Sequence, residues 1–341
     1  MTDLDNSCAS DDSSSAEFDL DFPRAANAPS LFATLRHTPE DFVVDEVVDW
    51  EPSGDGEHLL FHIKKRGANT GWVAEQLAKL ADVRVMDIGF CGLKDRHAVT
   101  TQWFSIYLPK RDVDWQNWVI EGVEILQVAR HKQKLRRGMH RANRFQINLT
   151  ELEGDTSDLT ERLQQIQAQG VPNYFGEQRF GRQGNNLVQA QTMFTSGDTQ
   201  KVLRRKTKKT GMYLSAARSW LFNKVLAERV RTGNWLSNMP GELRVDHCQE
   251  NQSPTGPLWG RGRSLVSDDV EQLEQQILSD WQVWCYGLEH AGLEQERRAL
   301  RLMPADFQWQ LSSDESTLSL SFQLPIGTFA TAVIREITRL R

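Results

Sequence analysis

Apolar and β-branched segments alternate with turn residues in the first half of the chain. Residues 42–48 are valine-rich, residues 59–63 are mostly apolar, and Pro52–Gly56 between them has the composition of a turn. This pattern predicts a β-hairpin. Further strands are predicted at 85–91, 102–108, 123–129, 144–149, 305–311 and 317–324.

A different periodicity marks the helices. A helix is predicted to begin at Thr70, because apolar residues then recur at helical spacing. Another is predicted to end at Gly170, and a last one follows Thr328, whose hydroxyl could cap it. The remaining helical segments are predicted at 213–231, 267–280 and 290–303.

The order of these elements predicts an α+β fold. Strands, a helix-rich block and strands again are typical of a sheet domain that an inserted domain interrupts. We expect the sheet domain over 30–169 and 304–341, and the inserted domain over 170–303. The pattern leaves open whether the last strands rejoin the first sheet. Residues 1–29 are Asp- and Ser-rich and are expected to be disordered, with order beginning near Leu31.

The net charge of −6 hides a clustering of cations. The first 30 residues hold seven acids and one arginine, so the rest of the 341-residue chain is neutral overall. No apolar stretch approaches the roughly 20 residues of a membrane span, so a cytoplasmic protein is expected. The four cysteines form no ligand spacing, and no metal or cofactor motif is visible.

Positive charge gathers in a basic stretch at residues 130–144, which contains no acid. Its cations suit contact with phosphates, and Asn143 and Phe145 could meet an unpaired base. The alternative is a solvated basic face with Phe145 in the core. The cations are Arg130, Lys132, Lys134, Arg136, Arg137, Arg141 and Arg144. A second basic cluster comprises Lys201, Arg204, Arg205, Lys206, Lys208 and Lys209. Its composition is equally compatible with an RNA-binding segment and with a flexible charged loop.

Asp95 is the candidate for chemistry. It lies in the segment Gly92–Arg96 between two predicted strands, flanked by Lys94 and Arg96, and these cations favour an ionised carboxylate. Such a carboxylate can act as a nucleophile toward a sugar carbon. From the residues alone, a solvated turn with paired surface charges is the simpler interpretation.

Two segments with aromatic residues could serve either to pack the core or to bind a ligand. Asn173–Gly181 mixes aromatic residues with glycines, which favours a packed turn at a domain junction over a binding loop. Phe329 precedes the last helix and could stack on a ligand, although burial is the commoner fate of a phenylalanine.

Six motifs together resemble the TruD family of tRNA pseudouridine synthases, and they cover nearly all of the chain beyond the acidic tail. They occur in the family's order at Glu40–Val44, Gly92–Thr100, Asn143–Phe145, Asn173–Gly181, Leu214–Arg218 and Leu324–Glu336.

The resemblance implies a pseudouridine synthase mixed-sheet catalytic domain with an inserted α+β TRUD domain. It implies that uridine-13 in the D arm of tRNA is isomerised to pseudouridine, without cofactor or metal. Asp95 would be the nucleophile, and Phe42, Asn143, Phe145 and Phe329 would line the uridine pocket. We further hypothesise that Arg335 pairs with Asp95.

Two other functions are compatible with parts of the pattern. A non-catalytic RNA-binding protein would keep the basic surfaces without the chemistry, and a methyltransferase would need a nucleotide-cofactor loop that is not visible. The expected partner is tRNA, with no membrane association and no obligate protein partner.

Overall fold

The computed structural model describes residues 18–196, 207–243 and 253–341. The chain divides into two units. The sheet unit comprises Arg24–Tyr174 and Arg301–Arg341. The helical unit comprises Phe175–Leu300 together with the N-terminal residues up to Pro23. This division falls at 174/175 and 300/301, whereas the expected domain boundaries are 169/170 and 303/304.

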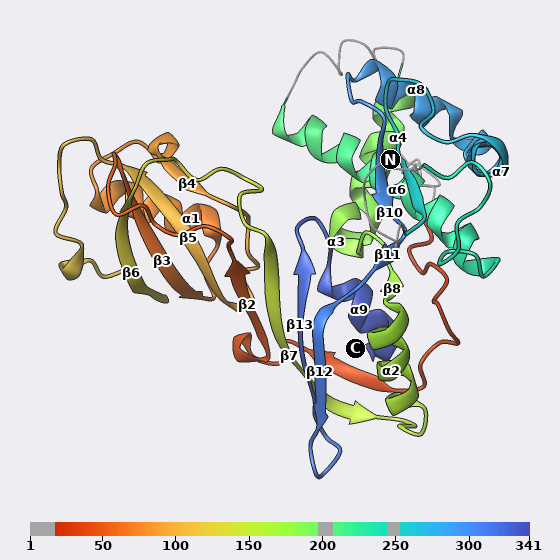
Figure 1. Cartoon of the computed structure of the whole chain (residues 1–341), viewed down its shortest axis with the longest axis horizontal. Helices are drawn as coiled ribbons and strands as arrows, with labels where there is room; N and C mark the ends of the chain where they lie inside the picture. Colours follow the sequence, from red (N-terminus) through yellow and green to blue (C-terminus); the bar gives the residue numbers. More distant parts are fainter. Residues whose placement is uncertain (1–17, 197–206, 244–252) are drawn as a thin grey trace, which may run out of the picture. The chain divides into compact units, whose positions relative to one another are not determined.

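A ten-stranded mixed sheet forms the centre of the sheet unit (Figure 1). Seven of its strands follow the order β12-β13-β7-β2-β5-β3-β6. The other three lie off this path: β1 pairs with β7 and β14, and β4 pairs with β5. β13 pairs with β7 along its whole length, so the C-terminal strands rejoin the first sheet and the α+β fold is confirmed. Its strands are β1 (Phe32–Leu35), β2 (Phe42–Val47), β3 (His58–Arg66), β4 (Ile88–Phe90), β5 (Val99–Tyr107), β6 (Val123–His131), β7 (Ala142–Glu153), β12 (Ala305–Leu311), β13 (Leu318–Pro325) and β14 (Arg339–Leu340). A separate short pair is formed by β8 (Val171–Pro172) and β11 (Arg301–Leu302).

The predicted hairpin is wrong. β2 pairs with β5 in parallel, and β3 pairs with the other edge of β5 in antiparallel orientation. β5 is almost entirely buried along its length, which favours a central position between two neighbours. The turn residues between β2 and β3 report only the local chain direction. Which strands become neighbours depends on how their side chains pack in the sheet.

Three α-helices belong to the sheet unit: α1 (Thr70–Leu80), α2 (Leu159–Gln169) and α9 (Ala330–Ile337). α1 begins at Thr70 and α2 ends before Gly170, as predicted. Gly170 has a φ of +73°, and a Cβ there would lie 2.4 Å from the Leu302 carbonyl oxygen, so only glycine fits. Short 3-10 helices occur at Pro39–Asp41, Val85–Asp87 and Trp115–Asn117. The second of these replaces the start of the strand predicted at 85–91.

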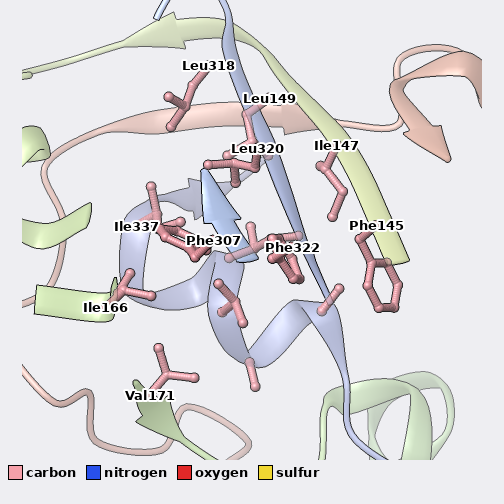
Figure 2. Packing of buried hydrophobic residues seen from close by; sticks show 14 of the residues in the cluster. Phe145, Ile147, Leu149, Ile166, Val171, Phe307, Leu318, Leu320, Phe322 and Ile337 are labelled. Carbon is pink, nitrogen blue, oxygen red and sulfur yellow. The ribbon is translucent and has the colours of Figure 1, made fainter. Parts of the chain in front are cut away.

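The two larger of the apolar clusters in this unit supply most of its core. The larger lies between α2, α9 and one face of the sheet, and Figure 2 shows its side chains converging from β7 and β13. The labelled members are Phe145, Ile147, Leu149, Ile166, Val171, Phe307, Leu318, Leu320, Phe322 and Ile337. The second cluster lies under α1 against β3 and β5. β2 and β7, which supply residues to the larger cluster, also carry the polar residues that are described below.

The helical unit is built around α6, whose sides are largely buried. Its elements are α3 (Glu177–Phe180), 3-10 helices at Arg182–Gly184 and Ser279–Trp281, α4 (Asn185–Thr195), α6 (Lys208–Arg231), β9 (Thr255–Leu258), α7 (Asp268–Ile277), α8 (Gln282–His290) and β10 (Glu296–Ala299). The helix predicted at 290–303 is wrong: Gly292 has a φ of +76°, and β10 then pairs with β9. None of the described helices has the length and apolarity that crossing a bilayer requires.

Order begins earlier than the sequence predicts. Phe18 and Phe22 pack against Trp220, with ring centroids 5.3 and 5.4 Å away. Phe22 is only 8% exposed. The expected start of ordered structure near Leu31 is therefore too late, because two aromatic residues in an acidic segment are enough to anchor it. Residues 1–17 of the predicted tail lie outside the described residues.

Candidate active site

The Gly92–Arg96 loop connects β4 to β5, which are antiparallel neighbours, so Asp95 lies between two strands as predicted. Its sequence neighbours do not pair with it. Lys94 Nζ turns inward to Glu46 and Asn143, and Arg96 Nε donates to the Gly67 carbonyl oxygen. Neither flanking cation therefore forms an ion pair with the Asp95 carboxylate.

Arg36 provides the counter-charge instead. Its Nη2 donates to Asp95 Oδ2 at 2.7 Å, and its Cζ lies 4.0 Å from the centroid of the Phe42 ring. The Asp95 side chain stays 43% exposed. Arg36 has a φ of +65°, an uncommon backbone conformation for a non-glycine residue. The hypothesis that Arg335 pairs with Asp95 is wrong, since its guanidinium forms an ion pair with Glu336.

Lys65 holds the backbone of the same residue. Its Nζ donates to the carbonyl oxygens of Asp95 and Ala68, both at 2.8 Å, and the residue is fully buried in β3. Burial lowers the pKa of Lys65 to about 8, although the charge of Asp95 opposes this shift. Asp95 is thus held by Arg36 at its side chain and by Lys65 at its main chain.

A second polar network lies behind the loop. Lys94 Nζ lies 3.1 Å from Glu46 Oε1 and 2.8 Å from Asn143 Oδ1. The Lys94 amide donates to the Thr70 hydroxyl, which in turn donates to Gln102. These contacts fasten the loop to β2, β7, β5 and the start of α1.

Burial shifts the pKa of two titratable groups in this region. Burial raises the pKa of Glu46 above its usual value even though the Lys94 charge opposes the shift. Burial also lowers the pKa of His140 to about 4, and the Lys94 charge adds to the effect. The neutral form of His140 is therefore strongly favoured at neutral pH.

The predicted pocket residues have different environments. Phe42 and Phe145 are buried in an edge-to-face pair with centroids 6.0 Å apart, and Phe145 stacks on Phe322 at 5.5 Å. Phe145 is therefore part of the core, in line with the packed alternative. Asn143 is half-buried, and its strand partner on β13 is Leu324. This pairing brings the C-terminal segment beside β7.

Phe329 is half-buried and immediately precedes α9, at the position expected of a capping residue. Thr328 does not cap this helix as predicted, because its hydroxyl donates to the Pro325 carbonyl oxygen inside the preceding turn.

The basic stretch is partly used within the fold. Arg130 pairs with Asp112, Lys132 pairs with Asp55 at 3.4 Å, and Lys134 donates to a main-chain carbonyl. Four arginines are exposed and have no carboxylate partner among the described residues: Arg136, Arg137, Arg141 and Arg144. These four are the residues of the stretch that remain available for a polyanion.

The structure describes only part of the second basic cluster, but all of Asn173–Gly181. Lys201–Lys206 of the second basic cluster lie outside the described residues, while Lys208 and Lys209 open α6. In Asn173–Gly181 the aromatic residues are buried, which agrees with the packed interpretation. Asn223 fixes Phe175 by accepting from its amide and donating to its carbonyl, both at 2.9 Å.

Three residues of this site, Arg36, Glu46 and Lys65, escaped the sequence analysis. Glu46 falls at the same strand parity as the buried Phe42 and Val44, and Lys65 falls at the same parity as buried residues of β3. A charge at a core-facing position of a strand is the signal that could have found them. Arg36 carried no such signal. The described residues contain no group of three or more His, Cys, Asp or Glu that could hold a metal ion.

The sequence is similar to proteins of one known family over most of its length. The family model for tRNA pseudouridine synthase D (TruD) matches residues 23–205 and 242–337. The tRNA pseudouridine synthase D of Cellvibrio japonicus is 47% identical over 332 residues, covering 95% of each chain. That of Nitrosococcus oceani is 44% identical over 332 residues, covering 91% of this chain and 92% of its own.

A solved structure shares the fold. The putative tRNA pseudouridine synthase D of Methanosarcina mazei superposes with a TM-score of 0.70 at 20% identity, covering 93% of this chain and 95% of that one. The family match and the relatives above 40% identity show that the chain belongs to the TruD family of tRNA pseudouridine synthases.

Proposed function

We propose that the protein isomerises uridine-13 in the D arm of tRNA to pseudouridine, with Asp95 as the nucleophile and without a cofactor. The observation that carries the proposal is the half-exposed carboxylate of Asp95, paired with Arg36 at 2.7 Å and tethered by Lys65 at 2.8 Å. The target position rests on the resemblance to the family, and the printed names of the relatives support tRNA as the substrate.

The reaction needs little more than a placed carboxylate and an enclosed base. The bond from C1′ to N1 breaks, a bond from C1′ to C5 forms, C5 loses a proton and N1 gains one, so the atoms of the product equal those of uridine. Breaking the first bond develops positive charge on the ribose, which a carboxylate stabilises. Asp95 acts either by attacking C1′ or by removing the C2′ proton.

A fixed carboxylate suits this chemistry better than a mobile one. Arg36 and Lys65 hold the side chain and the main chain of Asp95 before the substrate arrives. Such preorganisation removes the cost of ordering the group during the reaction. Lys65 donates to a carbonyl oxygen, which leaves both carboxylate oxygens of Asp95 clear of that ammonium group.

Binding must also remove the uridine from its stack, which costs a few kcal/mol. The four exposed arginines of the basic stretch can contact phosphates and offset this cost. The same proposal places the protein in the cytoplasm, where its tRNA substrate is found.

The test uses the purified protein and a tRNA transcript with uridine at position 13. Asp95→Asn should abolish pseudouridine formation, followed as release of the C5 hydrogen, and should change the Kd for tRNA by less than about threefold. Asp82→Asn is the matched control, because Asp82 is an exposed aspartate of the loop after α1. Turnover by Asp95→Asn would contradict the assigned nucleophile.

A second arm tests the position. A transcript with cytidine at position 13 should give no product. Pseudouridine at another site of that transcript would contradict the proposed target. Mapping pseudouridine in tRNA from cells that lack the protein checks the same point in vivo.

A further inference from the structure

Arg96 directly follows the proposed nucleophile and is held at both its main chain and its side chain. Its carbonyl oxygen accepts from the Ala98 amide at 2.9 Å. Its Nε donates to the Gly67 carbonyl oxygen at 3.2 Å, and the Gly67 amide donates to the Ala98 carbonyl oxygen at 3.4 Å. The guanidinium is therefore anchored to the turn between β3 and α1.

The outer part of this guanidinium is available to a ligand. Arg96 is exposed, and its Nη1 and Nη2 have no acceptor among the described residues. Nor does any carboxylate of the described residues form an ion pair with Arg96. The N–H groups of a guanidinium form a planar fork that matches two oxygens of a phosphate. Because Nε is already bound to the protein, less side-chain freedom is lost when the fork meets an anion.

The neighbouring Arg66 shows the opposite arrangement. It lies at the end of β3, beside the same turn, but its Nε and Nη2 both donate to the Glu40 carboxylate. Both side chains of this pair are more than half exposed. Arg66 therefore has a carboxylate partner within the protein, whereas Arg96 keeps its charge for an anion from outside.

The position of Arg96 determines which anion it can meet. Consecutive Cα atoms are about 3.8 Å apart, so Arg96 starts beside the residue that is proposed to act on the ribose of the target uridine. In RNA this ribose carries one phosphate on its 5′ side and another on its 3′ side. Lys65 Nζ joins the carbonyl oxygens of Ala68 and Asp95 at 2.8 Å each. The nucleophile and the guanidinium are thus tied to the same turn before RNA binds.

We propose that Arg96 binds one of the two phosphates that flank the target uridine and so fixes the ribose opposite Asp95. The inference rests on the proposed function. It distinguishes Arg96 from the exposed arginines of the basic stretch, because Arg96 is assigned to the target nucleotide itself. Losing a hydrogen bond to a charged group should weaken binding roughly 10- to 100-fold.

The experiment measures binding of RNAs in which one phosphate has lost its charge. All proteins carry Asp95→Asn, so that no RNA is converted. A methylphosphonate replaces the linkage on the 5′ side of uridine-13, the linkage on its 3′ side, or a linkage in the acceptor stem as the RNA control. The nucleotide before each such linkage carries a 2′-O-methyl group, which prevents its hydroxyl from attacking the phosphorus. The readout is the ratio of the Kd for each RNA to the Kd for a phosphodiester RNA with the same 2′-O-methyl group.

We expect the neutral linkage on one side of uridine-13 to weaken binding roughly 10- to 100-fold, and the one in the acceptor stem to have a clearly smaller effect. Arg96→Gln should weaken binding of the phosphodiester RNA by about the same factor. It should also bring the ratio at the flanking linkage to about 1, because the partner of that phosphate is gone. Arg96→Lys keeps the charge but lacks the planar fork, so its ratio should be intermediate.

Arg66→Gln is the matched control. It removes the same charge beside the same turn, from an arginine that already pairs with Glu40, and should leave every ratio unchanged. The proposal is overturned if Arg66→Gln acts like Arg96→Gln, if Arg96→Gln keeps the ratio at the flanking linkage, or if neither flanking linkage matters. Turnover of unmodified tRNA by the protein with Asp95 intact is measured separately. No turnover would overturn the proposed function, whereas turnover without an effect at either flanking linkage would overturn this inference alone.

Discussion

Arg36 and Asp95 lie 59 positions apart in the sequence and form an ion pair of 2.7 Å. The guanidinium also covers the Phe42 ring, so one residue orders both a charged and an aromatic part of the site. The counter-charge of the proposed nucleophile thus comes from the end of β1, a different strand from the two that carry its loop.

Removing this counter-charge should slow the reaction. We expect Arg36→Gln to lower the single-turnover rate on tRNA roughly 10- to 100-fold, because a hydrogen bond to a charged group contributes about 1.5–3 kcal/mol. Arg36→Lys keeps the charge but loses the planar stack on Phe42, and should lose less. Rates within twofold of wild type for both variants would contradict the role of Arg36.

The buried ammonium group of Lys65 should make the stability of the protein depend on pH. Its pKa is about 8 in the folded protein against an ordinary 10.5, so the unfolded chain binds more protons between these values. The free energy of unfolding should therefore gain a contribution that rises from pH 8 to 10.5, while below pH 8 the cost of the buried charge is fully present. Urea unfolding at several pH values should show this rise in the wild type and not in Lys65→Met.

Lys64→Met is the control for this measurement. Lys64 is the neighbouring lysine of β3, half exposed, with its Nζ 3.9 Å from Glu124. Its pH profile should follow that of the wild type. If the Lys65→Met profile also runs parallel to the wild type, the buried ammonium is not the cause.

The exposed arginines should govern affinity and not chemistry. We expect Arg136→Gln and Arg141→Gln each to weaken tRNA binding a few-fold and to reduce the slope of log Kd against log salt by about 0.7–0.9, while the rate at saturating tRNA stays unchanged. Arg84→Gln makes the same change in net charge at an arginine that pairs with Asp87 at 3.0 Å. An equal loss of affinity in that control would mean that only net charge matters.

The N-terminal anchor should contribute to stability. Phe22→Ala is expected to lower the free energy of unfolding by about 3 kcal/mol, the usual cost of truncating a buried phenylalanine. Phe32→Ala, at a residue that is 36% exposed, should cost clearly less. Thermal and urea unfolding compare the two, and equal losses would argue against a specific anchor.

Local signals in the sequence predicted much of the fold. Helical spacing located α1, and Gly170 marked the end of α2 because its backbone conformation excludes other residues. Strand order was not predictable, since the valine-rich segment of β2 gives no sign that β5 will pair with it. The helix predicted at 290–303 failed for a related reason: pairing with β9 outweighed a helical pattern.

The candidate site shows the same division. Asp95 could be proposed from the sequence because its motif is continuous. Arg36 and Glu46 could not be assigned as partners, because the contacts that define their roles join separate strands. The direction of a side chain could not be predicted either. Lys94 is next to Asp95 in the sequence, but its side chain contacts Glu46 and Asn143.

The pairing of β13 with β7 also bears on the order of events during synthesis. Between these two strands the ribosome must produce the whole of Phe175–Leu300. The helical unit is therefore synthesised before β13, and β14 can pair with β1 only later still. A nascent chain or a product truncated before Leu318 thus has an unfinished sheet, because the strand that covers β7 on one side is missing.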